Sequence, residues 1–272
     1  MKYFYLFILF SVGQIHAQEK YVTYHENGKV KIDAFVRNNV LDSLYREYYE
    51  NGNLKIEGFY KDCDYKTNKR EIYIAGCGLG YQINDTINKG KLHGVWKYYL
   101  EDGTLDQSKS YYCNLQHGNF IGYLEGKPLD VEFYHEGNII YSQQYNDQGF
   151  VIQTSNYEYI EDEKGRYTKI HSFEFYDDGN FKSETIESNE DNILIYKEYY
   201  PNGFLKLEYT TKNDERDGVY REYYENGHAK YEGIYKEDIP IEKQYYFNED
   251  GSLLKIEVWE KGKISKTEFP EK

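Results

Sequence analysis

The chain has 272 residues and a formal net charge of −14, because 47 Asp and Glu residues outnumber 33 Lys and Arg residues. This charge argues against binding to nucleic acid or anionic lipid, since neutralising phosphates takes clustered Lys and Arg side chains. Three cysteines are too few for the fold to depend on a disulfide framework, whereas 34 tyrosines dominate the composition.

The N-terminal segment is predicted to be an export signal. Lys2 gives a basic start, residues 3–12 form an almost unbroken apolar run, and Ala17 offers a small residue for signal peptidase. The run is too short to span a bilayer comfortably and no second one follows, so we expect no stable membrane insertion after signal cleavage. We therefore expect residues 1–17 to be removed and residues 18–272 to reach the periplasm or the extracellular space.

A repeat organises the rest of the chain. The segment LYREYYENG at residues 44–52 returns as VYREYYENG at residues 219–227, and the last copies follow one another at intervals of 24 residues. A fixed period of this length indicates stacked copies of one supersecondary unit, which usually present surfaces and seldom enclose a catalytic pocket. Weaker copies end at Gly28, Gly103, Gly137, Gly179, Gly203 and Gly251.

Each copy is predicted to be a β-hairpin with an Asn-Gly or Asp-Gly turn. Asn-Gly is the strongest short-range hairpin signal, because both central residues of a type I′ turn need a positive φ. With Asn226 and Gly227 at the turn, counting outward along the two strands places opposite charges across from each other. The same counting in other copies also pairs opposite charges. The expected pairs are Tyr224–Ala229, Glu222–Tyr231, Arg221–Glu232, Arg46–Glu57 and Lys197–Glu208. The predicted fold is all-β, an elongated single-layer antiparallel sheet of consecutive β-hairpins.

Alternation along the strands sorts the side chains onto two faces. The wetter face is expected to carry Arg46, Tyr48, Lys55, Glu57, Lys197, Tyr199, Lys206 and Glu208. On the drier face, rows of Tyr can pack along an open sheet, because Tyr combines strand propensity and a large apolar body with a hydroxyl for water. Nine residues of the drier face form the candidate binding surface, which we call the tyrosine face: Tyr45, Glu47, Tyr49, Tyr196, Glu198, Tyr200, Tyr220, Glu222 and Tyr224.

Glu47, Glu198 and Glu222 occupy one repeat position of the tyrosine face, between two tyrosines. Two interpretations stay open. In one, the glutamates line an acidic trough that binds a basic segment or a sugar. In the other, each Glu bonds a neighbouring Tyr hydroxyl or a Lys.

Two stretches interrupt the period and are predicted to be irregular inserts, at about residues 61–91 and 143–170. Cys63 and Cys77 lie in the first insert, where they could form a disulfide and leave Cys113 over. We expect no catalytic residues, no cofactor and no metal site. The histidines are scattered, and neither a Cys-x-x-Cys pair nor a phosphate-binding loop ahead of a helix occurs.

Two segments resemble a known family. The sequences GVWKYYLEDG at residues 94–103 and GVYREYYENG at residues 218–227 share a leading Gly, an aromatic residue, a Tyr pair, and Asn or Asp before the final Gly. In these residues the chain resembles the MORN-repeat family in its bacterial variant, which includes antitoxin-labelled YwqK-like proteins. The copies ending at Gly52 and Gly203 depart from the pattern, with Ser43 and Leu194 in place of the leading Gly.

The resemblance implies a stack of consecutive β-hairpins that contacts other proteins, and it supplies no catalytic residues. We therefore expect a non-enzymatic, exported protein-interaction module with an antitoxin- or immunity-like role. Its expected partner is a protein, either a toxin or an envelope protein. The alternative is an envelope carbohydrate-binding protein whose tyrosines stack on sugar rings.

Overall fold

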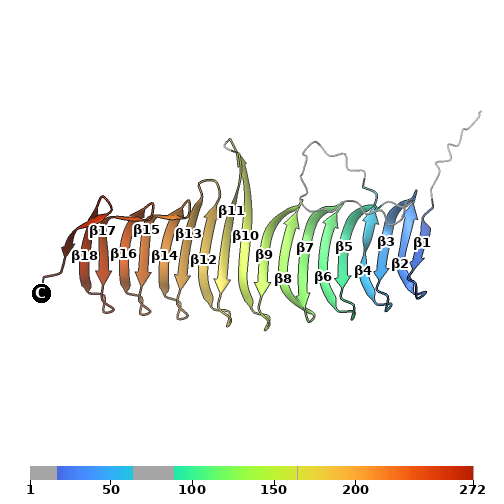
Figure 1. Ribbon diagram of the computed structural model, residues 1–272, viewed down its shortest axis with the longest axis horizontal. Helices are drawn as coiled ribbons and strands as arrows, with labels where there is room; N and C mark the ends of the chain where they lie inside the picture. The colour runs from blue at the N-terminus through green and yellow to red at the C-terminus, as the bar shows by residue number, and fades with distance from the viewer. Residues whose placement is uncertain (1–16, 64–88, 164, 272) are drawn as a thin grey trace, which may run out of the picture. The chain divides into compact units, whose positions relative to one another are not determined.

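The computed structural model describes residues 17–63, 89–163 and 165–271, and these residues form 19 β-strands and no helix (Figure 1). The predicted export signal and most of the first predicted insert lie outside the described residues. The strands are β1 (Glu19–Tyr24), β2 (Val30–Arg37), β3 (Val40–Tyr48), β4 (Leu54–Lys61), β5 (Lys91–Tyr99), β6 (Leu105–Tyr112), β7 (Leu115–Leu124), β8 (Lys127–His135), β9 (Asn138–Tyr145), β10 (Val151–Asp162), β11 (Gly165–Phe175), β12 (Phe181–Ser188), β13 (Ile193–Tyr199), β14 (Leu205–Lys212), β15 (Glu215–Tyr223), β16 (Ala229–Lys236), β17 (Ile239–Phe247), β18 (Leu253–Glu260) and β19 (Lys263–Glu268).

Strands that follow one another in the sequence pair antiparallel, which confirms the predicted all-β fold of consecutive hairpins in an open sheet. The chain divides into two compact units. Unit 1 comprises Met1–Leu105 with Ser110–Leu115, and unit 2 comprises Asp106–Lys109 with Gln116–Lys272. Within each unit the strands lie side by side in chain order (Figure 1). Among the described residues, no helix is long and apolar enough to cross a membrane.

The Asn-Gly corners are three-residue loops, not the predicted two-residue type I′ turns. The Gly227 N–H donates to the Tyr224 carbonyl at 2.9 Å, and the Tyr224 N–H donates to the His228 carbonyl at 2.8 Å. Only Gly227, with φ of 86°, has a positive φ in this loop. This geometry is a type I turn followed by a left-handed glycine. The same Gly-to-carbonyl bond closes the corners at Gly28, Gly52, Gly103, Gly149, Gly179, Gly203 and Gly251.

The longer loop leaves one residue of each following strand without a partner. Arg221 pairs with Glu232 and Glu222 pairs with Tyr231, as predicted, but the last pair is Tyr223–Ala229 instead of Tyr224–Ala229. Lys230 is the residue left between these partners, and it forms a β-bulge. The strand register is therefore confirmed, as it is for Arg46–Glu57 and Lys197–Glu208, while the pairing at the corner was wrong.

Type I′ turns do occur, at the other ends of the strands. There two consecutive residues have positive φ, as a type I′ turn requires. In unit 1, Asn38 and Asn39 have φ of 51° and 61° and join Arg37 to its partner Val40. Asn213–Asp214 and Glu237–Asp238 are among the further turns of this kind. The repeats that contain these turns thus have a three-residue corner at one end and a two-residue turn at the other. Elsewhere the connections differ, since two-residue turns stand at both ends of β8 and residues 189–192 join β12 to β13.

The middle of unit 2 is more regular than predicted. Gly137, expected to end a repeat, lies in the two-residue turn between His135 and its partner Asn138. Residues 143–170, expected as an irregular insert, instead contain the end of β9, a Gly149 corner, and the paired strands β10 and β11 of 12 and 11 residues. The period is lost here because the two strands are longer than in other repeats.

The leading glycine of the repeat takes a bulged, left-handed conformation. Gly94 and Gly218 have φ of 69° and 117°, and Ser43 and Glu242 adopt φ of 81° and 57° at the same repeat position. At Ser43 the register between β2 and β3 shifts. Leu194, also at this position, lies in a regular ladder without a shift. Ser43 and Glu242 therefore carry a backbone strain that glycine does not.

Ser43→Gly is expected to raise the free energy of unfolding by about 1 kcal/mol, because a non-glycine residue with this φ costs more than the added freedom of glycine in the unfolded chain. Urea unfolding followed by far-UV circular dichroism measures the change. The matched control is Leu194→Gly, which relieves no strain and should lower stability by about 1 kcal/mol or more. Equal destabilisation in both variants would contradict this account of the bulge.

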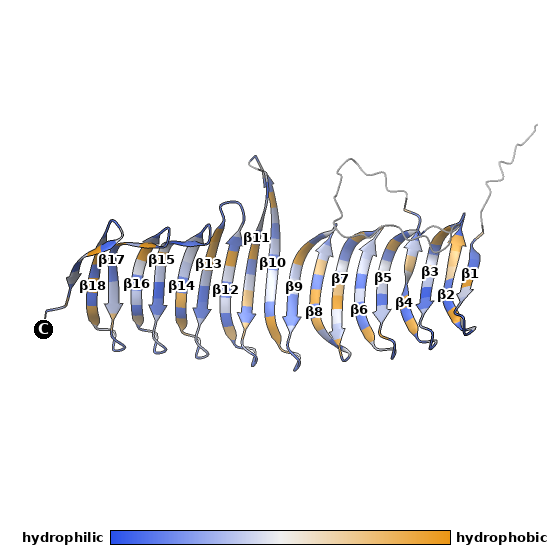
Figure 2. Cartoon of the chain, viewed as in Figure 1, coloured by the Kyte–Doolittle hydropathy of each residue, from blue (hydrophilic) through white to orange (hydrophobic). Residues whose placement is uncertain are grey.

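Unit 1 has the larger buried cluster. It consists of Ile32, Ala34, Val36, Leu41, Tyr45, Tyr60 and Trp96. Trp96 is 2% exposed, packs edge-on against Tyr60 at 4.8 Å, and lies over Gly58, where a Cβ atom would come within 2.2 Å of the indole ring. The close approach of Trp96 is therefore possible only because residue 58 is glycine. Figure 2 shows apolar and polar stretches mixed along the strands, as expected for a sheet without a second covering layer.

Unit 2 repeats this arrangement with a different side chain. Gln244 is fully buried over Gly233, and its amide nitrogen donates to the Ile234 and Ile241 carbonyls at 3.2 and 2.6 Å. The Gln244 carbonyl oxygen accepts a hydrogen bond from the Tyr231 hydroxyl. A buried polar side chain is tolerated here because its hydrogen bonds are satisfied.

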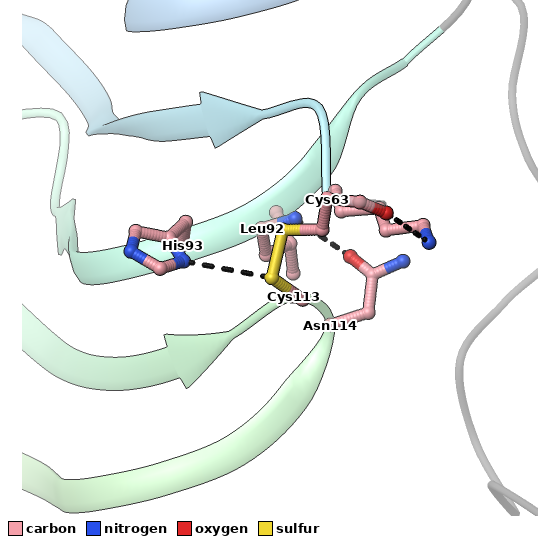
Figure 3. The surroundings of a disulfide bond; sticks show 6 residues. Cys63, Leu92, His93, Cys113 and Asn114 are labelled. Carbon is pink, nitrogen blue, oxygen red and sulfur yellow. Dashed lines mark hydrogen bonds between the residues drawn. A yellow bond between two sulfur atoms is a disulfide. The ribbon is translucent and has the colours of Figure 1, made fainter. Parts of the chain in front are cut away.

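The predicted disulfide partner of Cys63 was wrong. Cys63 is bonded to Cys113, 50 residues away, and Cys77 lies outside the described residues (Figure 3). Cys63 follows the end of β4 and Cys113 follows the end of β6, and alternate strands of a meander end at the same edge. Proximity in the folded sheet therefore selects Cys113, whereas proximity in the sequence suggested Cys77.

Candidate binding face

The charges of the tyrosine face are paired within it. Lys206 donates to Glu198 at 2.7 Å and Lys55 donates to Glu47 at 2.9 Å. In the same repeat position, Lys230 lies 3.0 Å from Glu222. Lys55 and Lys206 were expected on the wetter face. They reach the tyrosine face because both occupy the corner bulge, where the extra residue breaks the alternation of side chains.

The tyrosine hydroxyls also have partners in the fold. Tyr45 and Tyr220 donate to Glu47 and Glu222 at 2.9 and 3.0 Å. The tyrosines that open the corners instead donate to a backbone carbonyl of the next corner along the sheet. These bonds run from Tyr49 to Tyr99, from Tyr176 to Tyr199, from Tyr200 to Tyr223 and from Tyr224 to Phe247, at 2.8–3.0 Å.

Corner asparagines form a second link between repeats. The Asn226 side chain accepts from the His228 N–H at 3.0 Å and donates to the Glu249 carbonyl of the next corner at 2.7 Å. Asn27, Asn51 and Asn202 donate to the carbonyls of Glu50, Glu101 and Glu225 in the same way. The Asp250 side chain accepts from the Ser252 N–H at 2.9 Å but, unlike an Asn side chain, has no N–H of its own to donate. Asn at this position thus ties one repeat to the next.

In unit 2 the tyrosine face contains a continuous ladder of rings. Tyr196 packs against Tyr209 at 5.2 Å, Tyr209 stacks on Tyr220 at 6.1 Å, and Tyr220 meets Tyr231 edge-on at 5.8 Å. Tyr231 continues the ladder to Tyr246 at 5.0 Å. The first three rings are half-buried, whereas Tyr231 is buried. Each ring of the ladder is therefore partly shielded from solvent by its neighbours.

Burial and the paired glutamates keep these groups in their ordinary charge states. Burial, followed by the hydrogen bond to Glu222, raises the pKa of Tyr220 to about 12. Burial likewise raises the pKa of Tyr196 and Tyr209. Hydrogen bonds to Glu198 and Glu222 raise the pKa of Lys206 and Lys230. At neutral pH the face therefore presents neutral hydroxyls and balanced ion pairs.

The nine predicted residues divide between the units, with Tyr45, Glu47 and Tyr49 in unit 1 and the other six in unit 2. Sequence reasoning missed Glu174 and Lys182, which form the same ion pair at 3.1 Å one repeat before Glu198 and Lys206. The interval of 24 residues could have identified them, but Ser172 stands in the position of Tyr196. Tyr209 and Tyr231 were also missed, because they lie on the second strand of their hairpins.

The double variant Glu198→Gln/Glu222→Gln is expected to lose about 1 kcal/mol of unfolding free energy in total, since each half-exposed ion pair contributes roughly 0.2–1 kcal/mol. Urea unfolding at low and high salt measures the loss, and salt should reduce the difference from the wild type. The control Glu225→Gln/Glu249→Gln changes two exposed corner residues and should leave stability within about 0.5 kcal/mol of the wild type. A tyrosine-face variant as stable as this control would show that the pairs contribute nothing.

Five segments of the chain match the family model described as MORN repeat variant: residues 20–38, 41–62, 92–114, 194–213 and 216–237. These five segments are therefore similar to MORN-variant repeats, in agreement with the resemblance found in the sequence. Residues 115–193 lie outside the matched segments although the structure gives them the same antiparallel hairpins. The match identifies the repeat and does not distinguish the antitoxin-labelled group.

Comparison with whole proteins adds little. No curated protein matches the chain. Among solved structures, the crystal structure of TcdB2-TccC3 is similar over 90% of this chain and 13% of its own chain, at 9% sequence identity and a TM-score of 0.22. This chain thus spans a small part of that one, and a TM-score this low supports no inference about function.

Proposed function

We propose that the chain is a non-enzymatic, exported repeat protein that binds another protein through the tyrosine face of unit 2. MORN-variant repeats are typical of proteins that bind other molecules, and the tyrosine face recurs from repeat to repeat. The partner we propose is a toxin or an envelope protein, which would give the chain an antitoxin- or immunity-like role.

The observation that carries this proposal is the half-buried ring ladder of Tyr196, Tyr209 and Tyr220 beside balanced ion pairs. Tyr is enriched in protein interfaces because its rigid ring contributes a large contact area at a small entropic cost. Glu198 and Glu222 are neutralised by Lys206 and Lys230, so the face does not attract a basic segment by charge alone. A neutral, aromatic and periodic surface fits an extended protein segment better.

The carbohydrate alternative is less well supported by this geometry. Sugar rings stack on an exposed aromatic face, whereas Tyr209 is half-buried and has the rings of Tyr196 and Tyr220 at 5.2 and 6.1 Å from its own. The hydroxyls of Tyr200 and Tyr224 already donate hydrogen bonds to backbone carbonyls, so their protons are not available to a sugar. Glycan binding nevertheless serves as a distinct outcome of the test below.

The test compares two charge-reversal variants of the same size on opposite faces of unit 2. Lys206→Glu/Lys230→Glu alters the tyrosine face, and Lys197→Glu/Arg221→Glu alters the other face, where these cations pair with Glu184 and Glu208. The first variant breaks two ion pairs and the second breaks three, because Arg221 pairs with both Glu208 and Glu232, so the second should lose at least as much stability as the first. Each is used as bait on an envelope fraction of the source cells, beside the wild type.

The expected result is a protein retained at fixed stoichiometry by the wild type and by Lys197→Glu/Arg221→Glu, and lost from Lys206→Glu/Lys230→Glu. Equal retention by both variants, or no retained protein at all, would overturn the proposal. Retention of the wild type on purified peptidoglycan or glycan, lost in the same variant, would favour the carbohydrate alternative.

Export is tested separately. The first residue of the protein recovered from cells is expected to be Gln18, as determined by N-terminal sequencing. A chain that still begins at Met1 would contradict export without bearing on the binding proposal.

A further inference from the structure

Cys63, His93 and Cys113 come together at one edge of unit 1, although they belong to three different parts of the sequence (Figure 3). The Nδ1 atom of His93 lies 3.8 Å from the Sγ atom of Cys113, and one ligand atom from each residue lies within 4.8 Å of the others. In the oxidised chain the two sulfurs are bonded to each other. A disulfide offers no thiolate, so this state has no soft anionic ligand for a metal ion.

We propose that reduction of the Cys63–Cys113 disulfide converts this cluster into a binding site for one zinc ion. The ligands are the two thiolates and the Nδ1 atom of His93, with a water molecule in the fourth position. Two Cys and one His with an open position is an established zinc ligand set, because zinc prefers thiolate and imidazole in tetrahedral geometry.

The distances fit such a site. Bonds of about 2.3 Å to sulfur and about 2.0–2.1 Å to nitrogen place tetrahedral ligand atoms about 3.5–3.8 Å apart. The His93 nitrogen is already 3.8 Å from the Cys113 sulfur. Once their bond is broken the two sulfurs have to separate to the ligand spacing, and the Cys63 sulfur already lies within 4.8 Å of the His93 nitrogen.

The surroundings hold the ligands in place without the disulfide. Asn114 donates its N–H to the Leu92 carbonyl at 2.9 Å, and its side-chain oxygen accepts from the Leu92 N–H at 2.6 Å. These two bonds join Asn114, which follows Cys113, to Leu92, which precedes His93. The His93 ring also packs against Tyr112 at 5.3 Å. Cys63 is held by the Lys91 ammonium, which donates to its carbonyl at 3.1 Å.

The conversion balances with a thiol reductant. A dithiol transfers two electrons and two protons to the disulfide, so that the S–S bond breaks, Cys63 and Cys113 become thiols, and the dithiol becomes a cyclic disulfide. Zinc binding then releases the two thiol protons to solvent. The end of β4 and the turn after β6 are thereby joined in both states, by a covalent bond when oxidised and by the metal ion when reduced.

The experiment titrates the full-length mature chain with Co²⁺, a spectroscopic substitute for Zn²⁺, and then displaces it with Zn²⁺. The reduced sample is prepared with a phosphine: water supplies the oxygen of the phosphine oxide and the two protons of the thiols as the S–S bond breaks. We expect one ion per reduced chain, with the charge-transfer absorption of thiolate bound to cobalt, and at least a hundredfold weaker binding by the oxidised chain. Absence of binding by the reduced chain, or equal binding by both forms, would overturn the proposal.

Variants distinguish zinc binding at this site from zinc binding by other residues of the chain. His93→Gln keeps both cysteines, and it should weaken zinc binding by the reduced chain more than tenfold, since loss of a direct ligand costs at least as much as loss of an outer one. Far-UV circular dichroism of the oxidised variant verifies that the sheet is intact. The matched control His135→Gln replaces a histidine of unit 2 and should bind like the wild type. Weaker binding in His135→Gln, or in Cys77→Ser, to the extent seen in His93→Gln would show that the metal is held elsewhere.

Discussion

Replacing Trp96 with Ala is expected to lower the free energy of unfolding by about 3–5 kcal/mol. Trp96 is 2% exposed, contacts Tyr45 and Tyr60, and donates its indole N–H to the Phe59 carbonyl at 3.2 Å. A single-layer sheet has no second layer that could close over the space left behind. Urea unfolding followed by circular dichroism measures the loss.

Val95 provides the control for Trp96, because it is the preceding residue of the same strand and is 48% exposed on the other face. Val95→Ala should change stability by no more than about 0.5 kcal/mol. A loss in Val95→Ala equal to that in Trp96→Ala would show that the two faces were assigned wrongly.

Gly58 gives an independent test of the same contact. Gly58→Ala places a methyl group within 2.2 Å of the present position of the Trp96 ring, and it should cost about 1–3 kcal/mol through displacement of that ring. In the Trp96→Ala background the added methyl group meets no indole, so the second substitution should cost much less than it does alone. Additive losses would contradict direct contact between the two residues.

Loss of the Cys63–Cys113 disulfide is expected to cost about 4 kcal/mol, because the bond closes a long loop in the unfolded chain. The separation is 50 residues, and the two Cα atoms are 5.9 Å apart in the folded chain. Cys113→Ser, measured by urea unfolding in the presence of a metal chelator, isolates the effect of the bond from any bound metal ion.

Cys77→Ser distinguishes the two pairings. If Cys63 is bonded to Cys113, Cys77→Ser should unfold at the same urea concentration as the wild type, and peptide mapping without reduction should show Cys63 linked to Cys113. A large loss in Cys77→Ser with little loss in Cys113→Ser would restore the pairing predicted from the sequence.

Local patterns were sufficient for the class of fold and for most of the strand register. The opposite charges of Arg46 and Glu57, or of Arg221 and Glu232, identify which residues face each other, because like charges would meet in a slipped register. The charged pairs also gave the correct strand register although the predicted turn type was wrong. The type I turn with a left-handed glycine differs from a type I′ turn by one residue, and the bulge at Lys230 absorbs that residue before the charged pair is reached.

The tyrosine face was predicted only in part. Counting by twos placed Tyr196, Glu198 and Tyr200 together but put Lys206 on the opposite face, because a bulge is invisible to strict alternation. Glu174 escaped notice because Ser172 stands where the later repeat has Tyr196. The ring ladder depends on contacts between different hairpins, such as Tyr209 with Tyr220, which no single repeat contains.

The amino-acid sequence by itself determined that this chain is a series of antiparallel hairpins, because turn residues and cross-strand charges act over a few residues. Only the tertiary structure decided what lies next to what across repeats. The partner of Cys63, the cover over Gly58 and the neutralisation of Glu198 and Glu222 each depend on a strand or a bulge that local spacing does not reveal. The physical reason is that a sheet brings alternate strand ends to one edge, so its neighbours are set by the stacking of hairpins and not by distance along the chain.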